Sequence, residues 1–135
     1  MSSVRKSLQR AYDEAETIPF NAASKFVIMS DCHRGQGNNS DNFLPNQNLF
    51  FSALEHYYDE GFTYIELGDG DELWENRRMC PIIAAHSDAF WMMSKFYREN
   101  RLYMLYGNHD VVKSRKSFAK KHCSDYYCDS TGCCV

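Results

Sequence analysis

The segment KFVIMSDCH, at positions 25–33, joins a continuous apolar run to a polar cluster that follows it directly. Continuous apolar runs are typical of strands buried on both faces. A mostly apolar run followed by a polar cluster recurs in TYIELGDGDE, at 63–72, and in RLYMLYGNHD, at 101–110. Each apolar part predicts a strand, and each polar part offers side chains suited to chemistry. The expected strands span 25–30, 63–67 and 101–106.

Apolar residues at helical spacing predict helices between and around these strands. In the segment 48–60, Phe50 and Leu54 fall on one face, and Gly61 is expected to end the helix. Pro19 is expected to end the first helix. A loop rich in Gly, Asn and Ser is expected over 35–48. The last helix is basic, and a solvated face is its favoured interpretation. The expected helices span 4–16, 48–60, 88–100 and 111–122.

Alternation of strands and helices indicates an α/β fold with a parallel or mixed sheet. The 135 residues carry 15 basic and 18 acidic side chains, and 44% are hydrophobic, which suits one globular domain. The net charge of -3 gives no electrostatic reason to expect nucleic acid or an anionic membrane as partner. The sequence has no apolar run long enough for a membrane span, and its first 16 residues lack the apolar core of a secretion signal. We therefore expect a cytoplasmic location.

Four of the six cysteines lie in the tail at 123–135: Cys123, Cys128, Cys133 and Cys134. Their spacing lacks the C-x2-C pair of common zinc sites, and no secretion signal supports disulfides. Reduced thiols are the favoured interpretation.

The polar clusters carry the ligand types of a divalent metal site. Ligands of open α/β sheets bind beyond the carboxyl ends of the strands, where these clusters would meet. Asp31 offers a carboxylate and His33 an imidazole, and an extended D-x-H would point both side chains the same way, with Cys32 pointing away. Asp69 could bridge two ions, and Asn108 offers an amide oxygen. This mixture of oxygen and nitrogen donors suits Mn, Fe, Zn, Co or Ni.

His109 lies beside the candidate ligand Asn108. It could protonate a leaving oxygen or hold a phosphoryl group, with Asp110 orienting its ring. Gly68 and Gly107 are expected to let the backbone turn tightly where two of the strands end.

The motifs D-x-H, G-D-x-x-E and G-N-H-D, in this order and each after a strand, resemble those of the calcineurin-like metallophosphoesterase family. The resemblance covers 26–110 and implies the N-terminal β-α-β-α-β half of a four-layer α/β/β/α sandwich. It implies a dinuclear metal centre and hydrolysis of a phosphoester substrate by a metal-bound hydroxide. By this resemblance Asp31 and His33 bind one ion, Asp69 bridges, Asn108 binds the second ion, and His109 is the acid or the phosphate-stabilising residue.

Family members continue with another metal-binding histidine and a G-H-x-H motif, whereas this sequence has only His122 after His109. The expected domains are therefore an N-terminal helix and linker at 1–24, the N-terminal part of a phosphoesterase domain at 25–122, and a Cys-rich tail at 123–135 that begins a truncated remainder. Two interpretations stay open: a metal-dependent phosphoesterase, or a non-catalytic or fragmentary homologue that keeps the motifs.

Five further charged residues have two interpretations each. Arg34, Arg77 and Arg78 could hold a substrate phosphate, although solvated surface charges are favoured. Asp71 and Glu72 fit a helix N-terminus and a supporting role at the site equally well.

Overall fold

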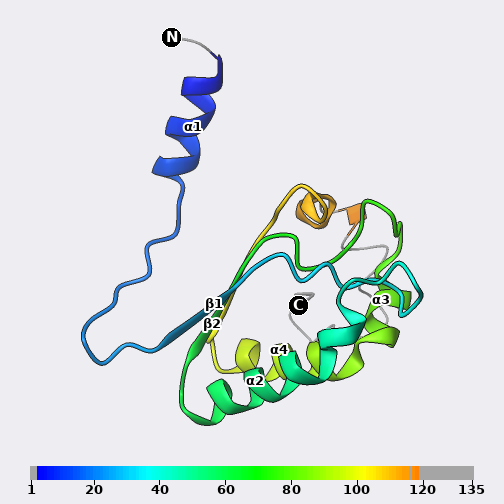
Figure 1. Cartoon of the computed structure of the whole chain (residues 1–135). Coiled ribbons are helices and arrows are strands. Elements are labelled where there is room, and N and C mark those ends of the chain that lie inside the picture. Colours follow the sequence, from blue (N-terminus) through cyan, green and yellow to red (C-terminus); the bar gives the residue numbers. More distant parts are fainter. Residues whose placement is uncertain (1–2, 116, 119–135) are drawn as a thin grey trace.

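The computed structural model describes residues 3–115 and 117–118 and has an α/β fold, which confirms the predicted class (Figure 1). Its strands are β1 (Phe26–Met29), β2 (Thr63–Leu67) and β3 (Leu102–Leu105). Its α-helices are α1 (Ser3–Asp13), α2 (Gln47–Asp59), α3 (Met79–Ala85) and α4 (Ser87–Arg98). Two short 3-10 helices, η1 (Leu44–Asn46) and η2 (Val111–Ser114), complete the described elements.

The three strands form a parallel sheet in the order β1-β2-β3, which agrees with the predicted parallel or mixed sheet. Ile28 pairs with Ile65, which in turn pairs with Tyr103. Because all three strands run the same way, their carboxyl ends lie at one edge of the sheet. The three polar clusters therefore start side by side.

Helices α2 and α4 cover one face of the sheet and enclose the main core (Figure 1). Tyr64 of β2 is fully buried there against Leu54 of α2 and Phe96 of α4. Burial of a large apolar side chain contributes about 1.5–3 kcal/mol. The core thus fixes the sheet from one side and leaves its carboxyl edge for the polar clusters.

The opposite face of the sheet is partly exposed. Ile28 of β1 is 56% exposed, Leu67 of β2 is 50% and Leu105 of β3 is 49%. The prediction that β1 is buried on both faces is therefore wrong. The continuous apolar run identified the strand correctly, but it did not show that one face of the strand is left exposed by the described residues.

Helix α1 stands apart from the sheet (Figure 1). It ends at Asp13, before the predicted boundary and well before Pro19. Its apolar side chains Val4, Leu8 and Tyr12 are all exposed in the described structure. Short helices gain most of their stability from packing against the rest of the protein. Because α1 has no buried face among the described residues, no packing contact stabilises a further turn after Asp13.

Two other helix predictions need correction. Helix α3 was not predicted, and its Pro81 lies in the first turn, where the missing N–H costs little. The helix predicted over 111–122 is interrupted, because Arg115 after the short η2 is extended, with φ −84° and ψ 120°, before residues 117–118 are helical again. His122 and the Cys-rich tail lie outside the described residues. No helix among the described residues is long and apolar enough to cross a bilayer.

A buried guanidinium joins the ends of β1 and β2. Arg34 is fully buried, and its Nη1 and Nη2 donate to the Glu66 carboxylate at 2.8 Å each, while its Nε donates to Asp71 at 2.8 Å. Burial disfavours the charge, but Asp71 and Glu66 raise the pKa of Arg34 above its usual range. Both interpretations of Arg34 as a phosphate-binding or solvated residue are therefore wrong.

Replacing Arg34 with methionine should strongly destabilise the fold. The substitution leaves the carboxylates of Glu66 and Asp71 buried without their main partner, which typically costs about 3–5 kcal/mol. Urea unfolding of Arg34→Met should show this loss, or the variant should fail to fold. Arg78→Met, at an exposed position, serves as the control and should stay within about 0.5 kcal/mol of wild type. Equal stability of the two variants would contradict the inferred role.

A second buried pair fixes the loop that follows Arg34. The Asp41 carboxylate lies 2.7 Å from Nε2 of His86 and accepts the backbone N–H groups of Gly37 at 2.7 Å and Phe43 at 3.0 Å. Burial alone would raise the pKa of Asp41, but the hydrogen bonds from Gly37 and His86 lower it. This loop therefore depends on the ionised form of Asp41.

Replacing Asp41 with asparagine should weaken the fold in a way that depends on pH. A lowered pKa in the folded state means that Asp41 stabilises the fold above its ordinary value of 3.8 and loses this effect as pH falls through the folded pKa. The difference in unfolding free energy between wild type and Asp41→Asn should be largest near neutral pH and shrink in acid. Chemical unfolding across this pH range measures it. A difference that grows in acid would refute the assignment.

Candidate metal centre

Backbone pairing between β1 and β2 continues beyond the strands into the polar clusters. The N–H of Asp31 donates to the carbonyl of Gly68 at 3.2 Å, and the N–H of His33 donates to the carbonyl of Asp69 at 2.9 Å. These bonds hold the D-x-H and G-D-x-x-E segments alongside each other. Consequently, ligand atoms of Asp31, His33 and Asp69 lie within 4.8 Å of one another.

These three residues share an unusual backbone conformation. Asp31 has φ 54°, His33 has φ 49° and Asp69 has φ 51°, all in the left-handed region. Asn100 is the only other non-glycine residue of the described chain with positive φ. The expectation of an extended D-x-H is therefore wrong. The side chains of Asp31 and His33 nevertheless approach each other, with Oδ1 of Asp31 3.9 Å from Nε2 of His33.

Left-handed backbone at three candidate ligands is a functional signal. The conformation costs an L-residue roughly 1–2 kcal/mol, so it persists only where the surrounding structure imposes it. Strain of this kind clusters at active sites and ligand clamps. Its coincidence with the carboxylate and imidazole groups selected from the sequence supports a common role for them.

Asp110 helps to impose the left-handed backbone at Asp69 through hydrogen bonds to the ends of β2 and β3. Its carboxylate accepts the backbone N–H groups of Asp69 at 3.3 Å, Gly70 at 3.2 Å and Gly107 at 2.8 Å. Lys113 donates to the same carboxylate at 2.9 Å and to Asp71 at 2.8 Å. Asp110 is thus fully buried and ties the end of β2 to the end of β3.

The carboxylate that contacts the ring of His109 belongs to Glu72. Nδ1 of His109 lies 2.7 Å from Oε2 of Glu72, and Nδ1 of His33 lies 3.1 Å from the same oxygen. The expectation that Asp110 orients the His109 ring is therefore corrected, because the Asp110 oxygens are occupied by backbone donors and Lys113. Glu72 matches the supporting interpretation, although the sequence did not show that it contacts both histidines.

The contact between Glu72 and His109 also shifts the pKa values of both side chains. Burial alone would raise the pKa of Glu72, but hydrogen bonds from His109 and His33 lower it. The hydrogen bond to Glu72 raises the pKa of His109 above its usual value. The indole of Trp74 lies against His109, with ring centroids 5.0 Å apart. The imidazole is therefore held in place on two sides, and Glu72 stabilises its protonated form relative to that of a free histidine.

The two glycines at the strand ends are needed for different reasons. Gly68 has φ 81°, as its expected turn requires. Gly107 instead provides space, because a Cβ there would lie 2.2 Å from Oδ1 of Asp69. That same Oδ1 accepts the N–H of His109 at 2.7 Å. Close approach of the β2 and β3 ends therefore depends on Gly107.

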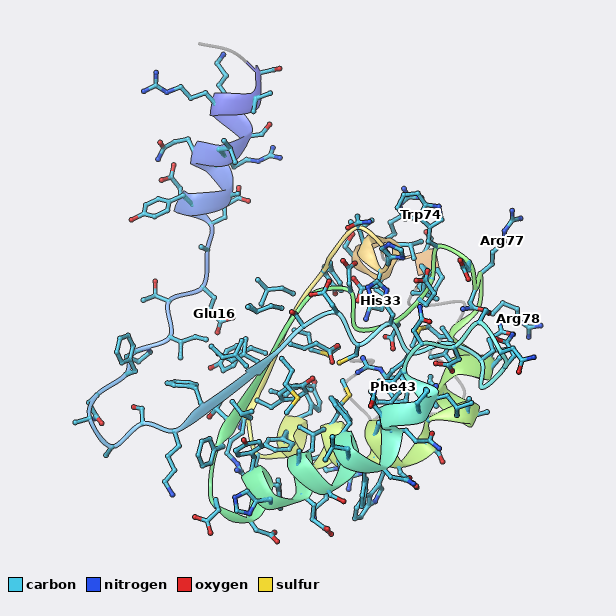
Figure 2. The ribbon with its side chains drawn as sticks, in the orientation of Figure 1. Glu16, His33, Phe43, Trp74, Arg77 and Arg78 are labelled. Atoms are coloured by element: carbon cyan, nitrogen blue, oxygen red, sulfur yellow. The ribbon has the colours of Figure 1, made fainter. Side chains whose placement is uncertain are left out.

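The remaining predicted site residues lie around this centre. Asn108 is exposed and immediately precedes His109, whose backbone contacts Asp69. Arg77 and Arg78 are exposed and extend away from the centre (Figure 2). Cys32 packs against the main core, as expected, and burial raises the pKa of its thiol to about 11.

Within the described part of the chain, two groups of side chains have the spacing of metal ligands: Asp31, His33 and Asp69 form one, and His33, Glu72 and His109 form the other. In the second group, Glu72 is already engaged by hydrogen bonds. Its Oε1 accepts the backbone N–H groups of Trp74 at 3.1 Å and Glu75 at 3.2 Å, while Oε2 lies against the two imidazoles. The first group has fewer competing contacts and is the better candidate for an ion.

Comparison of the chain with protein-family models, with curated proteins and with solved structures gave no match.

Asp31 should contribute to metal binding while weakening the metal-free fold. We expect Asp31→Gly to unfold at higher urea concentration than wild type without metal, because glycine accepts positive φ and removes the carboxylate beside Asp69. The expected gain is about 1 kcal/mol. Asp31→Asn removes the charge and keeps the strained backbone, so it should gain less. Lower stability of Asp31→Gly than of both wild type and Asp31→Asn would contradict this account.

Proposed function

We propose that this chain carries the metal centre of a metal-dependent phosphoesterase. The observation that carries the proposal is the convergence of Asp31, His33 and Asp69 at the carboxyl edge of a parallel sheet, all three with left-handed backbone. The three motifs that resemble the calcineurin-like metallophosphoesterases support the same chemistry. The proposal includes the fold that this resemblance implies, with the described sheet as the N-terminal half of an α/β/β/α sandwich.

The donor set fits a first-row divalent ion. Asp31 and Asp69 would supply carboxylate oxygens and His33 an imidazole nitrogen, a mixture that suits Mn, Fe, Zn, Co or Ni. Asp69 and Asn108 are the described residues available to a second ion. Bound divalent ions neutralise charge on phosphoryl oxygens and lower the pKa of water.

The surrounding residues would orient the ligands and supply a proton. With Nδ1 of His33 held by Glu72, Nε2 is the nitrogen left for an ion, an arrangement common at protein metal sites. With Nδ1 of His109 also held by Glu72, its Nε2 is left to donate a proton to the leaving oxygen. The raised pKa of His109 suits this donor role.

A non-catalytic, metal-binding homologue is the second candidate function. The observation that favours it is the unequal supply of ligands among the described residues. The first ion would have Asp31, His33 and Asp69, whereas the second would have Asp69 and Asn108. This alternative predicts metal binding without hydrolysis.

The Asp69→Asn variant tests the proposed function. Asparagine keeps the Oδ1 that accepts the N–H of His109, so the fold should survive while the anionic ligand is lost. We expect wild type to hold divalent metal by elemental analysis and to hydrolyse p-nitrophenyl phosphate with added Mn. Asp69→Asn should lose metal and lower turnover by about 100-fold or more.

Asp59→Asn, an exposed position at the end of α2, is the matched control and should behave as wild type. Metal binding by wild type with no turnover would favour the non-catalytic alternative. Unchanged metal content and turnover in Asp69→Asn would refute the assignment of the centre.

A further inference from the structure

A cavity of about 420 Å³ lies beside the candidate metal centre, between the end of β1 and helix α2. Its volume falls within the usual range of small-molecule sites, roughly 300–1,000 Å³. Most of its lining is apolar and comes from Met29, Cys32, Phe43, Leu49, Phe50 and Ala53. The cavity is therefore suited to an uncharged, apolar group.

Asp31 connects this cavity to the centre. Asp31 lines the cavity, and its side chain belongs to the group formed with His33 and Asp69. Asp31 is the only acidic or basic side chain among the cavity's described lining residues. A ligand that spans both regions would place its charged end at the centre and an uncharged end against the apolar lining.

The polar lining residues are few and neutral. Ser30, Asn42 and Asn46 offer hydroxyl and amide groups, which can orient a ligand without favouring a charge. A highly polar alcohol group would have to exchange water for this mostly apolar lining and would lose hydrogen bonds. The lining therefore favours an aryl or alkyl group over a sugar or a charged chain.

A second cavity, of about 290 Å³, offers no such combination. It lies near His86 and contains none of the candidate metal ligands. Both ring nitrogens of His86 are already paired, one with Asp41 and the other with Gln47. Its lining therefore serves as a control surface in the experiments below.

We propose that the cavity beside Asp31 binds the uncharged aryl or alkyl alcohol group of a phosphoester whose phosphoryl group lies at the metal centre. The inference rests on the proposed function and adds a substrate class to it. It also gives the loop held by Asp41 a role, because Asn42 and Phe43 of that loop line the cavity.

Binding of 1-naphthol to the full metal-free chain tests the cavity without any hydrolysis. Wild type should bind this phosphate-free probe saturably, as followed by its fluorescence. Ala53→Trp places a large side chain in the cavity and should weaken binding by about tenfold or more. Ser52→Trp is the matched control, because it adds the same side chain one residue earlier on α2, beside the other cavity. Its affinity should stay within about twofold of wild type.

Leu49→Asp provides a second variant in case Ala53→Trp does not fold. Leu49 is 72% exposed, so its replacement should leave folding intact while adding a charge to the lining. This variant should also weaken 1-naphthol binding. No saturable binding by wild type, or equal binding by Ser52→Trp and the two cavity variants, would overturn the inference.

Turnover of two esters separates the cavity from the chemistry. With added Mn, Ala53→Trp should lower kcat/KM for 1-naphthyl phosphate by about tenfold and leave that for methyl phosphate within about twofold. An equal loss on both esters would overturn the cavity inference and leave the phosphoesterase assignment standing. Cavity-dependent binding of 1-naphthol with no turnover of either ester would overturn the phosphoesterase assignment and retain an apolar ligand site.

Discussion

The buried guanidinium of Arg34 is the constraint on which the candidate site depends. Arg34 follows His33 directly in the sequence. Its three guanidinium nitrogens donate to Glu66 within β2 and to Asp71 beyond the end of β2. Asp71 shares Lys113 with Asp110, whose carboxylate accepts backbone donors at the ends of β2 and β3. One continuous set of buried charges thus ties together the ends of all three strands. Such a set is costly unless every member is paired, so its geometry tolerates little change.

This set of buried, paired charges makes the strained backbone at the candidate metal centre possible. Left-handed conformations at Asp31, His33 and Asp69 would relax in a loose loop, but here the neighbouring backbone is pinned by Gly68, Asp69 and Asp110 acceptors. The fold therefore spends stability to hold two carboxylates and an imidazole close together. Glu72 extends the arrangement outward by holding both histidine rings, and the apolar cavity begins on the other side of Asp31.

The sequence predicted much of the fold and only part of the site. Strand β2 and helix α2 were placed within a residue of their observed bounds, because their apolar spacing and Gly61 are strong local signals. Asp31, His33 and Asp69 were selected from residue type and position, and the structure brings them together. Arg34 was interpreted as a surface or phosphate-binding charge, since nothing near it in the sequence reveals Glu66, 32 residues away. The contact of Glu72 with both histidines was missed for the same reason.

By itself, the sequence determined the α/β class, the succession of strands and helices along the chain, and which polar residues follow each strand. These features depend on periodicity and turn chemistry within a few residues, which can be read along the chain. The tertiary structure decided the left-handed backbone of the three candidate ligands, the choice of Glu72 rather than Asp110 as the partner of His109, and the cavity beside Asp31. Each of these depends on which distant groups become neighbours once the strands pair and the helices cover the sheet. Buried charges then select their partners by distance in space, and local sequence carries no signal for that selection.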